Sequence, residues 1–319
     1  MSQASKCPPV LFLVFNRPDV SALVFEEIRK AKPPRLYVAA DGARPHKAGE
    51  AEKAAEVRKL ATTVDWECEV KTLFREENLG CKMAVSGAID WFFESEESGV
   101  ILEDDCVPDQ SFFQFCHEML EYYKDDDRVM KISGSNFIGD NFTQQEYSYF
   151  FSRYTHVWGW ATWRRAWKHF TLEMTEYEIV KENGLLSASF AVEGEEKHYW
   201  KAWEMTRSGK LDSWAYRWQY ALRANSGLTV IPRINMVSNV GFGVDSTHTS
   251  AKGDPLENFP RNAMRFPLNH PKLMLWDKQA DKFFYEKFLI LSFSTRFKLA
   301  LQEVIPPETY AKIKKLFGR

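Results

Sequence analysis

The sequence predicts an α/β fold in which a mostly parallel sheet is flanked by helices. Apolar runs of strand length recur along the first half of the chain, at 10–15, 35–42, 68–74, 99–102 and 129–133. Between these runs, apolar residues recur at helical spacing. Strands that alternate with helices build βαβ units, whose strands lie parallel. Ligands of such sheets bind at the carboxyl ends of the strands.

The intervening helices follow in order. The first strand is followed by "NRP" and a helix for which Asp19 serves as N-cap. A polar helix with one apolar stripe at 57–64 follows the second strand, and a turn and a helix at 78–93 follow the third. The helix after the fourth strand takes Asp109 as its N-cap. Its inward residues are Phe112, Phe113, Cys116, Met119, Leu120 and Tyr123.

The pattern changes in the second half. Residues 150–220 are dense in aromatic side chains and predict short helices, whereas 227–232 predict a strand and 235–250 a loop rich in Gly, Ser, Thr and Asn. The tail from Lys272 is helical. The sequence contains neither an internal repeat nor a low-complexity linker. We therefore expect one domain over residues 1–270 and a C-terminal helical extension at 271–319.

The composition of the 319 residues argues against several classes of protein. The net charge is −2, so no basic excess indicates nucleic acid as a partner. The five cysteines are odd in number and show no CxxC spacing, which indicates reduced thiols in a cytoplasmic protein. The apolar runs at 10–15 and 288–293 are too short for a signal peptide or a membrane span. The basic C-terminus "YAKIKKLFGR" leaves two interpretations open, a peripheral contact with the inner face of the cell membrane or a plain terminal helix.

Three adjacent carboxylates, Glu103, Asp104 and Asp105, end the strand at 99–102. Such a cluster is either a solvated strand end or a metal site. Asp109 is better placed to cap the next helix, which favours the metal site. Carboxylate oxygens suit Mg²⁺ or Mn²⁺, and Mg²⁺ commonly combines one or two carboxylates with substrate phosphates. A metal of this kind would hold a diphosphate, so a nucleotide is the expected partner.

Two common phosphate-binding motifs are missing from the sequence. No GxxxxGK[ST] run is present, and no GxGxxG follows the first strand, where the chain reads "FNRPD". A phosphate-transferring NTPase or a dinucleotide-dependent dehydrogenase is therefore not expected.

Several segments together resemble the GT-A fold glycosyltransferases. "VILEDDCVPDQSFFQFCHEML" is similar to their metal-binding segment, in the Glu-Asp-Asp variant found in N-acetylglucosaminyltransferase I. "VLFLVFNRPD", "YVAADG", "THVWGWATWRRAW" and "KLDSWAYRW" are similar to other segments of that family. The chain also resembles a bacterial group of hemolysin-related sugar-nucleotide transferases. The resemblance covers about residues 8–250, and it implies a nucleotide-binding half at about 1–135 and an acceptor half at about 136–270.

The resemblance also implies roles for individual residues. Asp105 would bind Mn²⁺ or Mg²⁺ directly, and Glu103 and Asp104 would meet the ribose or the donor sugar. Asp41 would accept a hydrogen bond from the uracil of a UDP-sugar, and Arg17 would reach the nucleotide. The alternatives without a ligand are a turn residue for Asp41, which precedes Gly, and a surface arginine at a helix start for Arg17.

The catalytic base implied by the resemblance is Asp212. An inverting transfer needs one carboxylate outside the metal cluster to take the proton of the acceptor hydroxyl. Asp212 matches the first Asp of the family's Trp-Asp-Asp-Trp segment, although this chain has Leu211 and Ser213 beside it. The alternative is an N-cap, because Asp before a helix is common. The family's His on the helix before the acidic strand has no counterpart, and Ser86 and Lys82 are weak candidates for that contact.

Two further residues are candidates for donor or acceptor contact. Trp160 follows Gly159, and its ring could pack against a sugar, with a core position as the alternative. His248 lies in the loop "NVGFGVDSTHT", which could order over the diphosphate, and His248 or Asp245 could touch phosphate or metal. A flexible loop without a ligand is the alternative.

Together these observations predict a metal-dependent, inverting glycosyltransferase of polysaccharide biosynthesis. Its donor would be a UDP-sugar such as UDP-GlcNAc, and its acceptor a hydroxyl of a glycan or a lipid-linked glycan. Two other functions stay open, a sugar-nucleotide pyrophosphorylase and a non-catalytic sugar-binding module.

Overall fold

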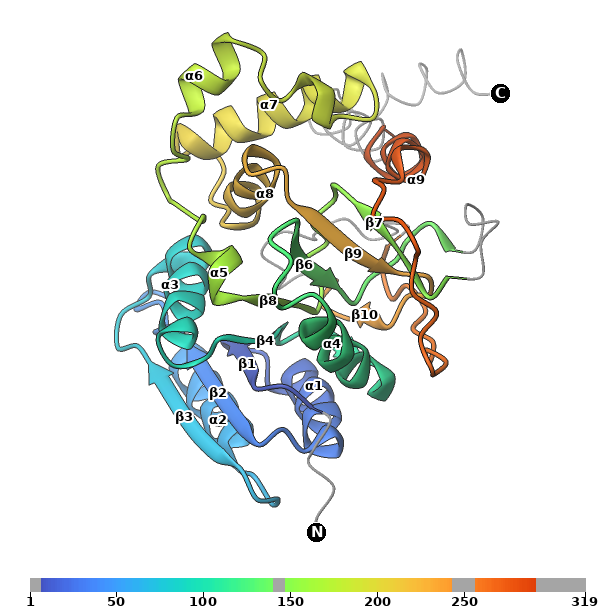
Figure 1. Cartoon of the computed structure of the whole chain (residues 1–319). Helices are drawn as coiled ribbons and strands as arrows, with labels where there is room; N and C mark the ends of the chain where they lie inside the picture. The colour runs from blue at the N-terminus through green and yellow to red at the C-terminus, as the bar shows by residue number, and fades with distance from the viewer. Residues whose placement is uncertain (1–6, 140–146, 243–255, 291–319) are drawn as a thin grey trace, which may run out of the picture.

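An eight-stranded mixed sheet forms the centre of the protein in its computed structural model, which describes residues 7–139, 147–242 and 256–290. The strand order is β3-β2-β1-β4-β8-β6-β9-β7, which can be followed in Figure 1. The pairs β3–β2, β2–β1, β1–β4 and β6–β9 are parallel, and the other three pairs are antiparallel. The predicted α/β class is therefore confirmed. The strands of the sheet are β1 (Val10–Val14), β2 (Arg35–Ala40), β3 (Glu69–Phe74), β4 (Ser98–Glu103), β6 (Val129–Ser133), β7 (Tyr149–Ser152), β8 (Trp160–Trp163) and β9 (Leu228–Pro232).

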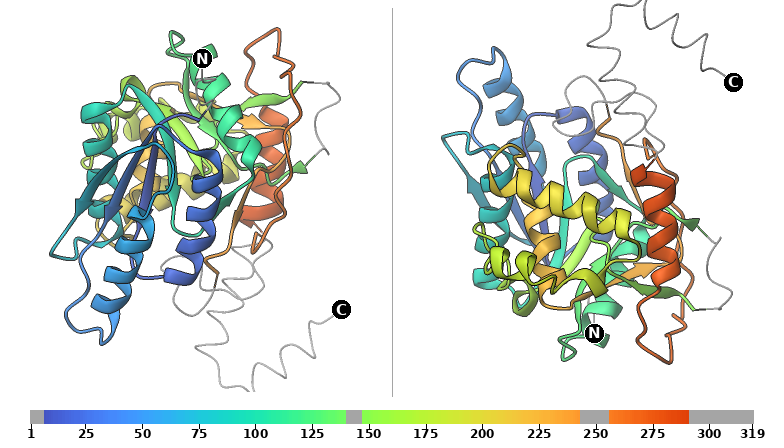
Figure 2. Two further views of the ribbon diagram at one scale, coloured as in Figure 1. Left: turned by 90° about the horizontal axis from the view of Figure 1, so that it is seen from below. Right: turned by 90° about the horizontal axis from the view of Figure 1, so that it is seen from above.

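A separate two-stranded ribbon pairs β5 (Cys106–Pro108) with β10 (Val237–Asn239) in antiparallel register. Helices lie on both sides of the main sheet (Figure 2). They are α1 (Pro18–Ala31), α2 (Glu50–Thr62), α3 (Gly80–Ser95), α4 (Gln110–Tyr122), α5 (Arg164–Trp167), α6 (Tyr177–Glu182), α7 (Glu193–Arg207), α8 (Ala215–Ala224) and α9 (Lys278–Phe284). A short 3-10 helix, η2 (Ser187–Ser189), precedes α7, and a π-helical turn, η3 (Tyr285–Ile290), continues α9.

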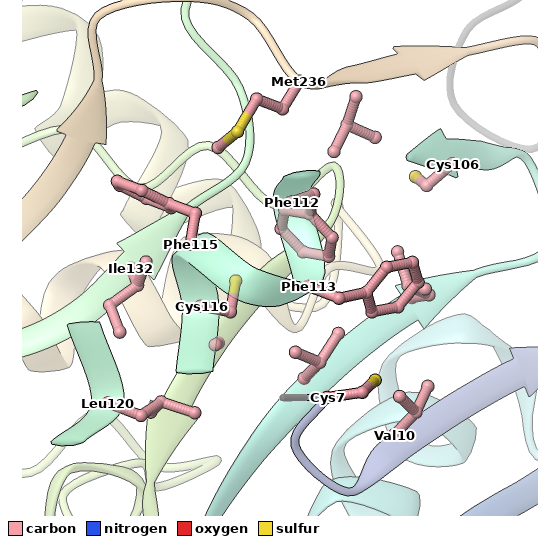
Figure 3. Packing of buried hydrophobic residues seen from close by; sticks show 14 of the residues in the cluster. Cys7, Val10, Cys106, Phe112, Phe113, Phe115, Cys116, Leu120, Ile132 and Met236 are labelled. Carbon is pink, nitrogen blue, oxygen red and sulfur yellow. The ribbon is translucent and has the colours of Figure 1, made fainter. Parts of the chain in front are cut away.

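Successive side chains of β1 point to opposite faces of the sheet, so the strand contributes to an apolar core on each face. Val10, Phe12 and Val14 point to the face covered by α1, α2 and α4, and Leu11 and Leu13 point to the face covered by α3 and α8. Figure 3 shows apolar side chains of α4 packed near Val10. A third apolar cluster joins α6, α7, α8 and α9 beyond the sheet.

Several local predictions are confirmed and others are wrong. The Asp109 carboxylate accepts from the Ser111 amide at 2.9 Å and so caps α4 as predicted, and β9 occupies the predicted strand. Asp19, however, is not an N-cap, because α1 begins at Pro18 with Arg17 in the cap position. The aromatic stretch after residue 150 contains two strands as well as short helices, and one of them, β8, lies antiparallel between β4 and β6.

No helix within the described residues is long and apolar enough to cross a membrane. The described part of the predicted C-terminal extension contains α9, whose N-cap Asp277 accepts from the Ala280 amide at 2.9 Å. The segment "YAKIKKLFGR" lies outside the described residues, so peripheral membrane contact stays a prediction.

Candidate functional site

A cavity of about 1,070 Å³ opens at the carboxyl ends of β1, β2 and β4. In the sheet, β2 and β3 lie on one side of β1 and β4 lies on the other, so the cavity is at the point where the strand order reverses. This is the usual ligand position in open α/β sheets. The charged residues that line it are Arg17, Asp19, Asp41, Arg44, Lys47, Glu50, Lys53, Arg75, Glu103, Asp104 and Asp212.

Arg17 is paired with the acidic triplet. Its guanidinium contacts both oxygens of Asp104, and its Nη2 lies 2.8 Å from Oδ2 of Asp105. The three side chains are mostly buried, with exposed fractions of 21%, 8% and 14% for Arg17, Asp104 and Asp105. The alternative of a free surface arginine is therefore wrong. One cation thus offsets two of the three adjacent carboxylates.

Burial and the repulsion between neighbouring carboxylates raise the pKa values of Glu103 and Asp104. Desolvation, followed by the charges of Asp105 and Asp104, raises the pKa of Glu103 to about 8. Desolvation also raises the pKa of Asp104, to about 6, even though the charge of Arg17 lowers it. The site therefore disfavours three ionised carboxylates at once, and a cationic ligand or a bound hydroxyl group would relieve the repulsion.

Asp41 lies at the end of β2 and faces the start of α3. Its carboxylate accepts from the amides of Leu79 and Gly80, each at 3.0 Å, so it caps α3 across the chain. It is 9% exposed and lines the cavity. The alternative of a turn residue is not confirmed, because the structural role of the carboxylate is to cap a helix that is distant in sequence. A carboxylate has about four lone-pair positions, so capacity for a ligand N–H remains.

Arg75 also lines the cavity, and sequence reasoning missed it. Desolvation lowers the pKa of its guanidinium, and the charge of Asp41 acts in the opposite direction. Arg75 follows β3 directly, and its amide donates to the carbonyl of Ala40 at 3.0 Å, which brings it beside Asp41. Its position just after the predicted strand at 68–74 was the available signal, since strand ends share one edge of a parallel sheet.

Asp212 reaches the cavity from the second half of the chain. It precedes α8, but Trp214 occupies the N-cap position, so the N-cap alternative for Asp212 is wrong. Its side chain is 53% exposed, and its Oδ1 lies 3.5 Å from Nζ of Lys82 on α3. The carboxylate of Asp212 is therefore exposed at the cavity, with one cation beside it.

Cys81, on the first turn of α3, was also missed. Burial comes first among the causes that raise the pKa of its thiol to about 12, followed by the charges of Glu103, Asp212, Asp41 and Asp105. The thiol therefore lies near acids from three separate segments of the chain. The sequence indicated only a reduced thiol at this position, and its place on the cavity wall comes from the structure.

Glu50, the first residue of α2, joins two turns of the cavity wall. Its buried carboxylate accepts from Asn16 Nδ2 at 2.8 Å and from the amide of Arg44 at 2.7 Å, and it contacts the Arg44 guanidinium. These bonds tie the turn after β2 to the turn that carries Arg17. The hydrogen bonds from Arg44 are the main reason that the pKa of Glu50 is lowered to about 2.

Replacing Glu50 with Gln is expected to lower the free energy of unfolding by about 1–3 kcal/mol at pH 7, the range for a lost buried hydrogen bond to a charged group. Because the folded-state pKa of Glu50 is below the ordinary glutamate value of 4.5, the wild-type advantage exists above pH 4.5 and disappears as the pH falls towards 2. Urea unfolding of both proteins from pH 7 to 3 measures this. A difference that does not shrink with falling pH would contradict the explanation.

The prediction for Trp160 is wrong. Its side chain on β8 is 0% exposed and does not line the cavity, so it cannot stack against a sugar there. It lies between the ring of Trp214, with centroids 5.7 Å apart, and Nζ of Lys131, 4.7 Å from the ring centroid. The core alternative is the correct one. Glycine at position 159 is explained by its left-handed backbone (φ +62°) and by Val237, which a Cβ at this position would approach to 2.8 Å.

Replacing Trp160 with Ala is expected to lower the free energy of unfolding by about 3–5 kcal/mol, the usual range for a buried aromatic. Nucleotide affinity of the folded protein should stay unchanged, because the ring is outside the cavity. Denaturant unfolding and calorimetric nucleotide titration below the transition measure the two effects. If Trp160→Ala had normal stability but no longer bound nucleotide, the result would contradict the core role and support the sugar-stacking role.

Asp105 is enclosed by the β5–β10 ribbon. Asn239 Nδ2 lies 3.2 Å from Asp105 Oδ1, and the Asn239 side chain accepts from the amide of Gly241 at 2.8 Å. A Cβ at Gly241 would lie 2.0 Å from Asp105 Oδ2, so only glycine fits. The predicted loop at 235–250 therefore begins with a short strand against the triplet. His248 and Asp245 lie outside the described residues.

The resemblance implies a divalent cation at Asp105, and the donor chemistry fits, because carboxylate oxygens are preferred ligands of Mg²⁺ and Mn²⁺. Within the described ranges, no three His, Cys, Asp or Glu side chains converge as a metal site. The Asp105 oxygen that could bind a cation is engaged by Arg17 at 2.8 Å. The residues present therefore fit a cation held by one protein carboxylate, on condition that Arg17 leaves it.

Comparisons with known proteins give partial likenesses only. No protein-family model matches the chain, and no curated protein matches it. Among solved structures, HddC from Yersinia pseudotuberculosis is similar to 49% of this chain and 77% of its own, at 11% identity and a TM-score of 0.30. A UDP-glucose pyrophosphorylase complexed with UDP-glucose is similar to 72% of this chain and 91% of its own, at 8% identity and a TM-score of 0.37.

Proposed function

We propose that the protein is a glycosyltransferase that moves a sugar from a nucleotide-diphosphate donor to a hydroxyl of a glycan or lipid-linked acceptor. One observation carries the proposal. A single cavity at the switch point of the sheet gathers Arg17, Asp41, Glu103 and Asp104 from the first half, together with the accessible carboxylate of Asp212 from the second half. A binding module would need no such second carboxylate.

The donor would be a UDP-sugar. Asp41 would accept from the N–H of the uracil, and the Arg75 guanidinium beside it would donate to a neighbouring carbonyl of the same base. Arg17 would move to the diphosphate, whose charge a guanidinium matches well. Glu103 and Asp104 would then accept from hydroxyl groups of the ribose or the sugar.

The chemical step would use Asp212 as the general base. Its carboxylate takes the proton of the acceptor hydroxyl while that oxygen forms a bond to the anomeric carbon. The bond between the anomeric carbon and the diphosphate oxygen breaks, and the electron pair leaves with UDP. Attack from the side opposite the leaving group inverts the configuration. Arg17 stabilises the charge that develops on the diphosphate.

A divalent cation is part of the proposal. Asp105 would hold it after exchange with Arg17, and the donor phosphates would complete its coordination. When bound, it would supply positive charge to the leaving diphosphate. His248 and Asp245 stay proposals as additional contacts to phosphate or metal.

Calorimetric titration with UDP, with and without Mn²⁺, tests the proposal first. We expect UDP binding that Mn²⁺ strengthens, and thermal stabilisation by UDP-sugars greater than by GDP-sugars, since a ligand of the folded state raises the apparent stability. The absence of nucleotide binding would reject the proposal in favour of a sugar-binding module. Pyrophosphate-dependent formation of UTP from a UDP-sugar would instead identify a pyrophosphorylase.

A further inference from the structure

The carboxyl ends of β2 and β3 are held together by a side chain outside the cavity. The last residues paired in the ladder between these strands are Ala40 and Phe74. The next two residues are Asp41 and Arg75, which both line the cavity. The position of one side chain relative to the other therefore depends on what holds their backbones after the ladder ends.

Two backbone bonds continue past the ladder, from the Arg75 amide to Ala40 and from the Gly42 amide to Glu77, and Arg58 of α2 adds a side-chain link to them. Its Nη2 donates to the carbonyl of Asp41 at 3.1 Å and to the carbonyl of Arg75 at 2.6 Å. The guanidinium carbon lies 5.1 Å from the ring centroid of Phe74, and this cation–π contact helps to hold the Arg58 side chain in place. Arg58 does not line the cavity. One guanidinium on α2 thus bridges the two carbonyls and links the strand ends by two additional hydrogen bonds.

We infer that Arg58 is a positioning residue that sets the separation of Asp41 from Arg75 and thereby the selectivity for the base of the nucleotide. The inference rests on the proposed function. Uracil presents an N–H donor between two carbonyl acceptors, which matches one carboxylate beside one guanidinium. Cytosine presents an acceptor nitrogen where uracil has the N–H, so it would face the Asp41 carboxylate unfavourably. Preference for UDP over CDP is the expected property of a correctly spaced pair.

Replacing Arg58 with Met keeps the apolar stem over Phe74 and removes both donated hydrogen bonds. We expect the Kd for UDP to rise about tenfold, because two carbonyls lose a charged donor and the strand ends separate. The Kd for CDP should change less, so the preference for UDP over CDP should fall. The kcat at saturating donor should stay within about twofold of wild type, because Arg58 touches neither Arg17 nor Asp212. Arg58→Lys keeps one donor and should restore part of the preference.

The matched control is Lys59→Met, which removes a neighbouring exposed cation from the same helix. It should leave both Kd values unchanged. Hydrogen–deuterium exchange adds a readout that needs no nucleotide, because the amides of Gly42 and Arg75, which bond across the strand ends, should exchange faster in Arg58→Met than in Lys59→Met.

The outcomes separate the inference from the proposed function. Equal losses of UDP and CDP affinity in Arg58→Met, or unchanged affinity for both, would overturn the selectivity role. Unchanged amide exchange at 42 and 75 would overturn the positioning role. Wild-type protein that binds no UDP would reject the proposed function, while the exchange measurement would still decide whether Arg58 holds the strand ends. If Arg58→Met does not fold, the same comparisons apply to Arg58→Lys.

Discussion

Replacing Asp212 with Asn is expected to lower kcat for sugar transfer by about 10²–10⁴-fold, the usual contribution of a positioned general base. The amide has the shape of the carboxylate but cannot take the proton of the acceptor hydroxyl. The affinity for UDP should stay within about twofold of wild type, because the Asp212 side chain is 53% exposed and pairs with Lys82, whereas Arg17 pairs with Asp104. Transfer assays at saturating donor, together with UDP calorimetry, measure the two quantities.

Two neighbouring variants serve as controls for Asp212. Ser213→Ala changes the adjacent side chain, whose hydroxyl accepts from the Tyr216 amide at 3.4 Å, and should leave kcat nearly unchanged. Lys82→Met removes the cation 3.5 Å from the carboxylate and should lower kcat several-fold at most, since exposed ion pairs are weak. Normal transfer by Asp212→Asn would mean that another group is the base. Loss of UDP binding in that variant would assign Asp212 to the donor site instead.

The first half of the fold could be predicted because its local sequence patterns and its long-range contacts favour the same strands and helices. The apolar runs are strands, buried except at the edge strand β3, and the helices between them present one apolar face, as the buried phenylalanines of α4 illustrate. Strand β8 could not be predicted in the same way. Its sequence, "WATW", is part of a tryptophan-rich stretch, and its place between β4 and β6 is fixed by contacts distant in sequence, such as Ile101 with Trp160.

In the candidate site, too, some residues could be predicted from the local sequence and others could not. Arg17, Asp41 and the acidic triplet were predicted to lie near one another because strand ends of a parallel sheet share an edge, and the structure places them together. Arg75 was missed because no motif marks it, and Cys81 because it was interpreted only as a reduced thiol, whereas the structure places both on the cavity wall. Trp160 was misassigned because a tryptophan after a glycine has the same sequence pattern whether its ring faces a ligand or the core.

Replacing Arg17 with Met is expected to have opposite effects on the two ligands of the site. Arg17 and the proposed divalent cation would compete for Asp105 Oδ2, which lies 2.8 Å from Nη2. Loss of the guanidinium should therefore tighten Mn²⁺ binding by the nucleotide-free protein about tenfold, because a repelling charge within a few ångströms is removed. The same change should weaken UDP binding about tenfold or more, because the diphosphate loses a charged hydrogen-bond donor.

Electron paramagnetic resonance of free Mn²⁺ and UDP calorimetry measure these two changes. Arg35→Met is the matched control, because it removes the same charge from a pair with Glu96 at the opposite end of β2 and should alter neither affinity. Asp105→Ala should abolish Mn²⁺ binding and remove any dependence of UDP affinity on the metal. If Arg17→Met leaves Mn²⁺ binding unchanged while UDP binding falls, Arg17 serves the diphosphate without competing for Asp105. If Asp105→Ala keeps metal-dependent UDP binding, the cation is held elsewhere, and the exchange of Arg17 for a metal is excluded as the way in which the cluster accepts its donor.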